Sequence, residues 1–311
     1  MKEKIKISQL VKDNNLVVLG GEKGLDRYIE KYELSRPGFE MVGFFDFFEP
    51  SRLVLFGSKE STFFKERLSH DEQDTFVCNL FAKNPPALVF SCHVDVPEIF
   101  IRKSDKFNVP VLKSNLVTTA TSSKLYGYLI ERLAERISVH GVLVDIHGLG
   151  TLIIGKSGIG KSEVAMELIK RGHRLVSDDR VDIFEREVGT VIGKAPKLLE
   201  KYMEIRGIGV VNVTSLFGVS AYRESKKIRF VVELEKWEAG KNYDRIGLEK
   251  NTTKFFNTEI PKIVLPVAPG RNIASLVESA AMNERLKYMG YNSAEIFVES
   301  LHQKINESED N

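Results

Sequence analysis

The sequence lacks any run of about 18 consecutive apolar residues, the length that a membrane-spanning helix needs. Its first residues, Met-Lys-Glu-Lys-Ile-Lys, carry positive charge but no apolar stretch behind them, so a secretory signal peptide is not expected. Cysteine is scarce, because Cys78 and Cys92 are the only two and neither belongs to a CxxC pair. The cysteines therefore suggest neither a disulfide framework nor a zinc site. We therefore expect a soluble, cytoplasmic protein without a membrane partner.

A strong charge of one sign is also missing. The 45 lysines and arginines nearly balance the 43 aspartates and glutamates, which leaves a formal net charge of +2. Proteins that bind nucleic acid usually carry a basic field or a basic helix, and neither stands out here, so nucleic acid is not an expected partner. With 311 residues, 42% of them hydrophobic, the chain is long enough for two domains with ordinary globular cores.

The first half alternates short apolar strands with helical stretches. Strands are predicted at 16–18, 52–56, 87–91 and 109–112. A helical pattern covers 5–14, and another follows Gly57. This alternation favours an α/β domain, with a parallel sheet as one form of it. A long amphipathic helix over 121–138 is predicted to connect the two halves, which gives domains of 1–130 and 131–311.

The second half mixes strands and helices and ends in helices. The predicted strands are 142–146, 151–154, 175–176 and 228–234, and the predicted helices are 162–170, 273–289 and 294–305. Leu276, Val277, Ala280 and Ala281 are expected to form the packing face of the helix over 273–289. The tail at 306–311 is expected to be disordered.

A glycine-rich segment matches the phosphate-loop pattern G-x-x-x-x-G-K-[ST] without a mismatch. It reads Gly155, Lys156, Ser157, Gly158, Ile159, Gly160, Lys161 and Ser162. The segment follows an apolar strand and opens a helix, where glycines let backbone N–H groups surround a phosphate at the positive helix end. Lys161 can bind the β and γ phosphates, and the Ser162 hydroxyl can complete a Mg²⁺ shell. The segment therefore predicts binding of a nucleoside triphosphate, and Mg-ATP above others.

Two adjacent acids, Asp178 and Asp179, follow the short strand at 175–176. The helix between is only about three turns long, which predicts that this strand returns beside the strand that feeds the loop. The carboxylates would then lie near the γ-phosphate, one close to the metal and the other taking a proton from an attacking hydroxyl. Ser-Asp-Asp is also ordinary turn material, so a plain surface turn is the alternative.

Several weaker signals surround this pair. Glu204 and Arg206 flank an isoleucine and are expected on one strand face, where the acid can reach Mg²⁺ and the arginine a phosphate. A solvated strand edge explains the same pair more simply. His140 and Arg245 each allow a functional or a structural role. Residues 266–272 form a stiff turn that is either an anion site or an ordinary proline-glycine turn.

Four blocks of the second half together resemble the bacterial HPr kinase/phosphorylase family. They are 155–163, 171–182, 204–213, and 266–272 followed by 280–283. Many NTPases share the first block, but the other three are more specific to the family, and all occur in the family's order. The first half fits the family's variable N-terminal domain in length and position.

The resemblance implies an N-terminal α/β domain and a C-terminal P-loop kinase domain, with a mixed, phosphoenolpyruvate-carboxykinase-like sheet and closing helices. It implies a two-way enzyme that transfers the γ-phosphoryl group of ATP to a serine of HPr, the phosphocarrier of the sugar phosphotransferase system. In the reverse direction, inorganic phosphate would remove that group and release pyrophosphate. The reaction would regulate sugar uptake and carbon catabolite repression. The resemblance also implies a homohexamer activated by fructose 1,6-bisphosphate.

The resemblance further implies roles for individual residues. Its catalytic positions match His140, Lys161, Asp179 and Arg245, with Asp179 as the base in one direction and the acid in the other. Asp178 is expected to support the metal or to orient Asp179. Ser162 and Glu204 match its Mg²⁺ positions. Positions linked to phosphorolysis are Arg206, Pro266, Val267, Ala268, Pro269, Gly270 and Arg271. Ala268 departs from the family, which has an arginine there, and this weakens the expected phosphate handling.

Two other functions are compatible with the glycine loop. One is a small-molecule kinase, although no substrate pocket is marked in the sequence. The other is a nucleotide-dependent switch or assembly protein without phosphoryl transfer, which would leave Asp178 and Asp179 without a role.

Overall fold

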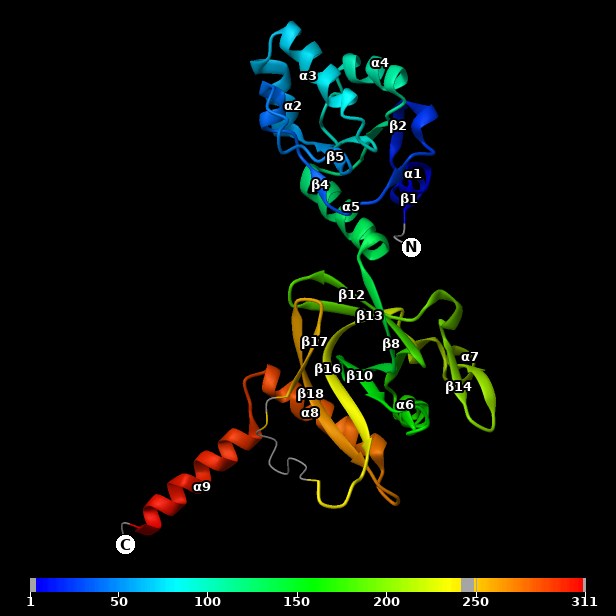
Figure 1. Cartoon of the computed structure of the whole chain (residues 1–311), viewed down its shortest axis with the longest axis vertical. Helices are drawn as coiled ribbons and strands as arrows, with labels where there is room; N and C mark the ends of the chain where they lie inside the picture. The colour runs from blue at the N-terminus through cyan, green and yellow to red at the C-terminus, as the bar shows by residue number, and fades with distance from the viewer. Residues whose placement is uncertain (1–3, 242–248, 250, 310–311) are drawn as a thin grey trace. The chain divides into compact units, whose positions relative to one another are not determined.

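The computed structural model of the chain describes residues 4–241, 249 and 251–309. It divides into two compact units, Met1–Glu135 and Arg136–Asn311 (Figure 1). The boundary expected near residue 130 falls in the last turn of α5 (Thr118–Leu133). Each unit has hydrophobic cores of its own.

The first unit is built around a sheet with the strand order β2-β7-β6-β5-β4. The strands are β2 (Val17–Gly20), β4 (Leu34–Ser35), β5 (Leu53–Phe56), β6 (Leu88–Phe90) and β7 (Val111–Lys113). The last four are parallel to one another, and β2 is antiparallel to β7. A small pair, β1 (Ile5–Lys6) and β3 (Tyr28–Ile29), lies beside α1 (Ile7–Asn14). The predicted α/β domain with a parallel sheet is thus confirmed.

Helices bury the strands of this sheet on both faces. The remaining helices of the unit are α2 (Ser58–Arg67), α3 (His70–Ala82) and α4 (Glu98–Phe107), with short 3-10 turns at Glu22–Gly24 and Phe39–Val42. All residues of β5 and β6 are buried, as the apolar runs of strands covered on both faces require. Phe56 of β5 stacks on Phe90 of β6 at a centroid distance of 4.6 Å. Ser69 and Glu72 form a capping box that fixes the start of α3.

The second unit contains a mixed sheet with the strand path β11-β9-β10-β16-β13-β12-β8, to which β18 and β17 are added beside β16. The strands are β8 (Arg136–His140), β9 (Val142–Ile146), β10 (Leu149–Gly155), β11 (Arg174–Ser177), β12 (Arg180–Glu187), β13 (Thr190–Lys194), β16 (Ser225–Lys236), β17 (Thr252–Phe255) and β18 (Thr258–Val267). β10, β16 and β18 are parallel, and the other pairings are antiparallel. The mixed sheet implied for this half is therefore confirmed.

Two helices pack on one face of this sheet, α6 (Lys161–Lys170) and α8 (Ile273–Tyr288) (Figure 1). Their apolar residues share one core cluster with β9, β10 and β16. A second core cluster consists of other strand residues, including Leu143, Leu152 and Val181. The unit also contains the hairpin of β14 (Tyr202–Ile205) and β15 (Gly209–Asn212), the short helix α7 (Val213–Phe217), 3-10 turns at Lys197–Leu199 and Val219–Ala221, and the last helix α9 (Ser293–Glu309).

The connecting helix is shorter than predicted. α5 ends at Leu133, and residues 136–138 of the predicted helix belong to β8 instead. β8 pairs with β12, so Ile137 belongs to a strand of the sheet and not to the apolar face of a helix. Strands β12, β13, β17 and β18 were also not predicted, although β12–β13 and β17–β18 are local hairpins, because charged and polar residues interrupt their apolar patterns.

Two predictions near the C-terminus are wrong in part. Leu276 is 38% exposed, whereas Val277 and Ala281 are buried with Ala274, and Ala280 packs against the same core. α9 continues to Glu309, so the tail expected to be disordered is helical over residues 306–309.

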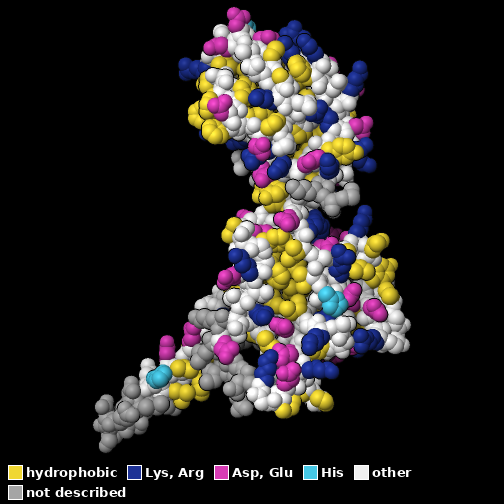
Figure 2. Space-filling model, viewed as in Figure 1, with side chains coloured by type: hydrophobic (Ala, Val, Ile, Leu, Met, Phe, Trp, Pro, Cys, Tyr) yellow, Lys and Arg dark blue, Asp and Glu magenta, His cyan; other side chains and the backbone are white. Residues whose placement is uncertain are grey.

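Charge is mixed over the surface. Figure 2 shows lysine and arginine side chains interspersed with aspartate and glutamate on the visible face of each unit, in keeping with the near balance of charges. Within the described ranges, no helix combines the length and the apolar character that crossing a membrane would require.

Candidate active site

The phosphate loop and most of the predicted catalytic residues meet in one pocket of the second unit. The pocket has a volume of about 240 Å³. Its lining residues are His140, Ser157, Gly158, Gly160, Lys161, Ser162, Glu163, Asp178, Asp179, Glu204 and Arg206. They come from four segments of the chain that lie up to 66 residues apart in the sequence, so only the tertiary structure brings them together.

The glycine loop joins the end of β10 to the start of α6. Gly158 and Gly160 have φ angles of +80° and +102°, in the left-handed region that glycine adopts without strain. Lys161 is 6% exposed, and its Nζ donates to the carbonyl oxygens of Gly155 at 3.0 Å and Lys156 at 3.2 Å. Burial lowers the pKa of the Lys161 ammonium, and the carboxylates of Asp179 and Asp178 oppose that effect. The loop thus presents backbone amides, a helix N-terminus and a cation to the pocket.

The strand that carries the paired aspartates does not lie beside the strand that feeds the loop, contrary to the prediction. β9 lies between them. It precedes β10 in the chain and pairs with it as a hairpin, and β11 pairs with the other edge of β9. Both β10 and β11 are antiparallel to β9, so they run in the same direction and end at the same edge of the sheet. Asp178 therefore still reaches the loop.

Asp178 is buried at the centre of the pocket wall, with 2% of its surface exposed. Its Oδ1 accepts a hydrogen bond from Ser162 Oγ at 2.8 Å, and its Oδ2 accepts one from the backbone N–H of Glu204 at 3.0 Å. Burial raises the pKa of the Asp178 carboxyl, while these hydrogen bonds act in the opposite direction. Asp178 therefore positions the loop serine and the β14 backbone together.

Asp179 has a different environment from its neighbour. Its side chain is 61% exposed, and its backbone lies in the left-handed region with φ of +63°. His140 Nδ1 lies 3.1 Å from Asp179 Oδ1 and 2.9 Å from the Asp179 carbonyl oxygen. The pairing of β8 with β12, which places His140 opposite Arg180, creates this contact. Asp179 is therefore an accessible carboxylate that a histidine can orient, and the plain surface turn does not describe it.

Glu204 and Arg206 both line the pocket, but they do not share a strand face. β14 ends at Ile205, and Arg206 lies in the turn of the hairpin with β15. Met203 is 1% exposed in the core that contains α6, which anchors the hairpin. A Cβ atom on Gly158 would lie 3.2 Å from Arg206 Nη1, so the guanidinium group sits directly against the glycine loop.

The oxygen atoms of the pocket suit a hard divalent cation. Ser162 of α6 supplies a hydroxyl, Asp178 and Asp179 supply carboxylates from the turn between β11 and β12, and Glu204 supplies one from β14. Oxygen ligands of this kind are preferred by Mg²⁺, which usually binds one or two carboxylates together with substrate phosphates. The residues present therefore fit such an ion.

Some predicted residues lie elsewhere. Arg245 is outside the described residues. The segment 266–271 comprises the last two residues of β18 and the turn that leads to α8, and it does not line the pocket. Its turn is closed by the Arg271 N–H donating to the Ala268 carbonyl oxygen. Because β18, β16 and β10 are parallel, this segment still lies at the sheet edge where the glycine loop lies.

One pocket residue was not among the predicted site residues. Glu163 follows Ser162 in the first turn of α6 and lines the pocket. Its position directly after the loop was the available signal. Among the loop residues, Ile159 does not line the pocket, and its side chain packs against the apolar core.

Comparisons with known proteins cover both units. The family model described as HPr Serine kinase N terminus matches residues 5–129, and the one described as HPr Serine kinase C-terminal domain matches residues 131–301. The HPr kinase/phosphorylase of Bacillus subtilis (strain 168) is 47% identical over 306 residues, which cover 98% of each chain. That of Listeria monocytogenes (strain HCC23) is 47% identical over 305 residues, which cover 98% of this chain and 97% of the relative.

A solved structure is also similar. The HPr(Ser) kinase/phosphatase from Coxiella burnetii is 36% identical to this chain in the aligned region, with a TM-score of 0.47. The alignment covers 52% of this chain and 98% of that one.

Proposed function

The chain belongs to the HPr serine kinase family and is a kinase that uses ATP, and we propose that its pocket transfers the γ-phosphoryl group to a serine of HPr. One observation carries the proposal: the phosphate loop and the Asp179–His140 pair line the same pocket. A loop that only bound nucleotide, as in a switch protein, would not need an accessible carboxylate there. The match over 98% of the chain to relatives named HPr kinase/phosphorylase supports HPr over a small-molecule acceptor.

The forward reaction is an in-line displacement. The loop amides and Lys161 hold the β and γ phosphates, and Mg²⁺ bound through Ser162 and Glu204 would offset the negative charge on them. Asp178 holds the Ser162 hydroxyl and the Glu204 backbone in place through its two carboxylate oxygens. The serine hydroxyl oxygen of HPr attacks the γ-phosphorus. The bond between the γ-phosphorus and the β–γ bridging oxygen breaks, and ADP leaves.

Asp179 takes the proton of the attacking serine. Its exposed carboxylate faces the pocket, and His140 holds it from the neighbouring strand. In the reverse direction an oxygen of inorganic phosphate attacks the phosphorus of phosphoserine and the bond from that phosphorus to the serine oxygen breaks. Protonated Asp179 gives its proton to the serine oxygen, and pyrophosphate is released. The same carboxyl group thus acts as base when the serine oxygen loses its proton and as acid when that oxygen regains it.

Several positive groups serve the reverse reaction in this proposal. Arg206 contacts the glycine loop and can bind a second phosphate group. Residues 266–271, at the same sheet edge, would contribute Arg271, whereas Ala268 brings no charge. Arg245 is assigned to the active site by its match to the family motif. The phosphorylase direction is therefore proposed to be the weaker of the two.

Family membership supports three further proposals. Catalysis belongs to residues 131–311, and the domain of 1–130 has a separate role. The active form is a homohexamer in the cytoplasm, and fructose 1,6-bisphosphate activates it. Size measurements in solution and kinase assays with and without that sugar test these statements.

The test of the central proposal is Asp179→Asn. Removing the proton acceptor is expected to lower phosphoryl transfer by about 10²–10⁴-fold, the usual contribution of a general base, and to leave ATP binding intact. Label transfer from γ-labelled ATP to HPr measures the first, and nucleotide titration measures the second. Asp26→Asn is the matched control, because Asp26 is 86% exposed and lies outside the pocket. Labelling of HPr at near wild-type rate by Asp179→Asn refutes the assignment.

A further inference from the structure

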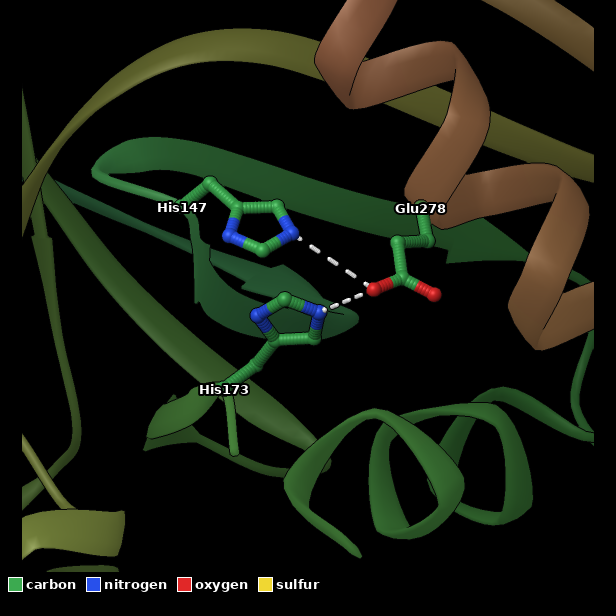
Figure 3. A group of neighbouring side chains, drawn as sticks. All are labelled: His147, His173 and Glu278. Atoms are coloured by element: carbon green, nitrogen blue, oxygen red, sulfur yellow. Dashed lines mark hydrogen bonds and ion pairs between the residues drawn. The ribbon is translucent and has the colours of Figure 1, made fainter. Parts of the chain in front are cut away.

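A second group of ionisable side chains lies in the kinase unit away from the active site. We propose that His147, His173 and Glu278 form a binding site for a transition-metal ion of the Zn²⁺ type (Figure 3). The three residues come from the turn between β9 and β10, the turn between α6 and β11, and the middle of α8. None of them lines the active-site pocket.

The three side chains converge on one point. Glu278 Oε1 lies 2.8 Å from His173 Nε2 and 3.5 Å from His147 Nε2, and Figure 3 shows both rings directed at this oxygen. One ligand atom from each residue lies within 4.8 Å of the other two. Zinc bonds to nitrogen and oxygen of about 2.0–2.1 Å place ligand atoms of a tetrahedral site about 3.4 Å apart. The distance of 3.5 Å between Glu278 and His147 already matches this value, and the 2.8 Å between Glu278 and His173 would have to lengthen by about 0.6 Å.

The surrounding contacts already orient the ligands. Arg171 Nη1 donates to Glu278 Oε2 at 2.9 Å, which leaves Oε1 for the two imidazoles. The His173 side chain is 3% exposed and is held against the His147 ring edge-to-face, with centroids 4.6 Å apart. Outer contacts of this kind fix the orientation of metal ligands in known sites. The site is therefore largely preformed.

Carboxylates and cations are both found around the three ligand residues. Arg171 is bound to Glu278, and Asp145 accepts from Arg223 at 3.0 Å and from Lys226 at 2.9 Å. Asp145 Oδ1 is buried and has no hydrogen-bond partner in the described part of the chain. Arg171, Arg223 and Lys226 are thus already paired with carboxylates, whereas Arg174, which also lines the adjoining pocket, is exposed. The adjoining pocket of about 320 Å³, which His147, His173 and Asp145 line, leaves room for a water as the fourth ligand.

The ligand types also separate this site from the Mg²⁺ site. Two imidazoles and one carboxylate are a common zinc set, whereas Mg²⁺ prefers oxygen alone. α6 begins at the active-site loop and ends next to His173, and its ten residues span about 15 Å. A bound ion would link the turn between α6 and β11 to α8. At their other ends, α6 carries Ser162 and β11 leads to Asp178 in the active site.

The test compares two histidine-to-asparagine variants of the full-length chain. His147 and His93 both have left-handed backbones, with φ of +47° and +60°, and both are exposed. Asparagine tolerates this conformation, and His147→Asn creates an Asn-Gly hairpin turn, so neither variant should lose its fold. Zn²⁺ is titrated against a chromophoric chelator with Mg²⁺ in excess, and Co²⁺ is used as a visible-absorbing probe of tetrahedral coordination.

The wild type and His93→Asn are expected to bind one equivalent of Zn²⁺ with equal affinity and to give a tetrahedral Co²⁺ spectrum. His147→Asn and Glu278→Gln are expected to bind at least about ten-fold more weakly. Zn²⁺ should also raise the melting temperature of the wild type and of His93→Asn, but not that of His147→Asn or Glu278→Gln. Equal Zn²⁺ affinity of His147→Asn and wild type overturns the proposal. So does the absence of stoichiometric binding to the wild type, which would leave only a hydrogen-bonded cluster.

Discussion

Asp178 and Asp179 are neighbours in the chain, yet their surroundings give them different chemistry. Asp178 is buried and bonded to Ser162 and to the Glu204 backbone, so it organises other groups. Asp179 is exposed and paired with His140, so it is available to a substrate. The left-handed backbone at Asp179 turns the two side chains toward different partners. Residues in this sparsely populated region are common at functional sites.

Asp178→Asn is expected to make the protein more stable and less active. The variant removes a buried charge, and an asparagine can still accept from the Glu204 N–H while its amide donates to Ser162 Oγ. We expect a gain of about 1 kcal/mol in unfolding free energy at pH 7, as for other stabilising changes at active sites. Phosphoryl transfer should fall, because the serine is no longer held by a carboxylate. Urea denaturation and HPr labelling measure the two effects.

The pH dependence of this gain has a definite sign. The pKa of Asp178 is raised in the folded state, so the folded protein binds its proton more readily than the unfolded chain does. The wild type is penalised above that folded pKa and gains stability as the pH falls through it. The stability difference should therefore shrink as the pH approaches the ordinary aspartate value of 3.8. A difference that stays constant from pH 7 to pH 4 contradicts this account.

At the scale of elements, the active site depends on one loop and one hairpin that touch. The loop turns at Gly158, against which the Arg206 guanidinium group lies. The hairpin is anchored by Met203 in the same core that holds α6. The loop and the phosphate-binding arginine are therefore positioned by the same packing.

Gly158→Ala is expected to weaken ATP binding without unfolding the protein. The methyl group would meet Arg206 Nη1 at 3.2 Å on a backbone with φ of +80°. A strained residue of this kind costs on the order of 1–3 kcal/mol, so the ATP affinity should fall about ten-fold or more. Gly189→Ala is the matched control, because its φ is +84° and nothing lies within 4 Å of the new methyl group. Equal ATP affinities of the two variants, measured by nucleotide titration, would sink this prediction.

At the scale of the whole molecule, the chain consists of two units that each bury their own cores. The first unit packs its phenylalanines around β5 and β6, and the second packs α6 and α8 on its mixed sheet. The described active-site pocket lies wholly within the second unit. The described lining of this pocket therefore contains no residue of the first unit.

A fragment of residues 134–311, which starts after the end of α5, is expected to fold and to bind ATP as tightly as the full chain. Its cores and its phosphate loop are complete without the first unit. Trp237 is the single tryptophan and lies in this unit, so its fluorescence follows the unfolding of this unit alone. A fragment that shows no cooperative fluorescence transition, or that fails to bind ATP, contradicts the independence of the unit.

The sequence determined the local features of this protein. A strand, a glycine loop and a helix follow one another in the chain at 149–170, so the phosphate loop could be predicted from spacing alone. The apolar runs of β5 and β6 likewise predicted buried strands and the α/β class. Helix boundaries failed where tertiary pairing overrode local pattern, as at the end of α5 and at Leu276.

Only the tertiary structure decided which side chains meet. β9 separates β11 from β10, β8 brings His140 to Asp179, and the hairpin turn brings Arg206 to Gly158. The same is true of His147, His173 and Glu278, which are up to 131 residues apart in the sequence. Strand pairing and helix packing join distant residues through the burial of apolar surface, which no local spacing records. The phosphate loop was predictable because its residues are contiguous in the chain. The assembled pocket was not, because it depends on contacts between residues far apart in the sequence.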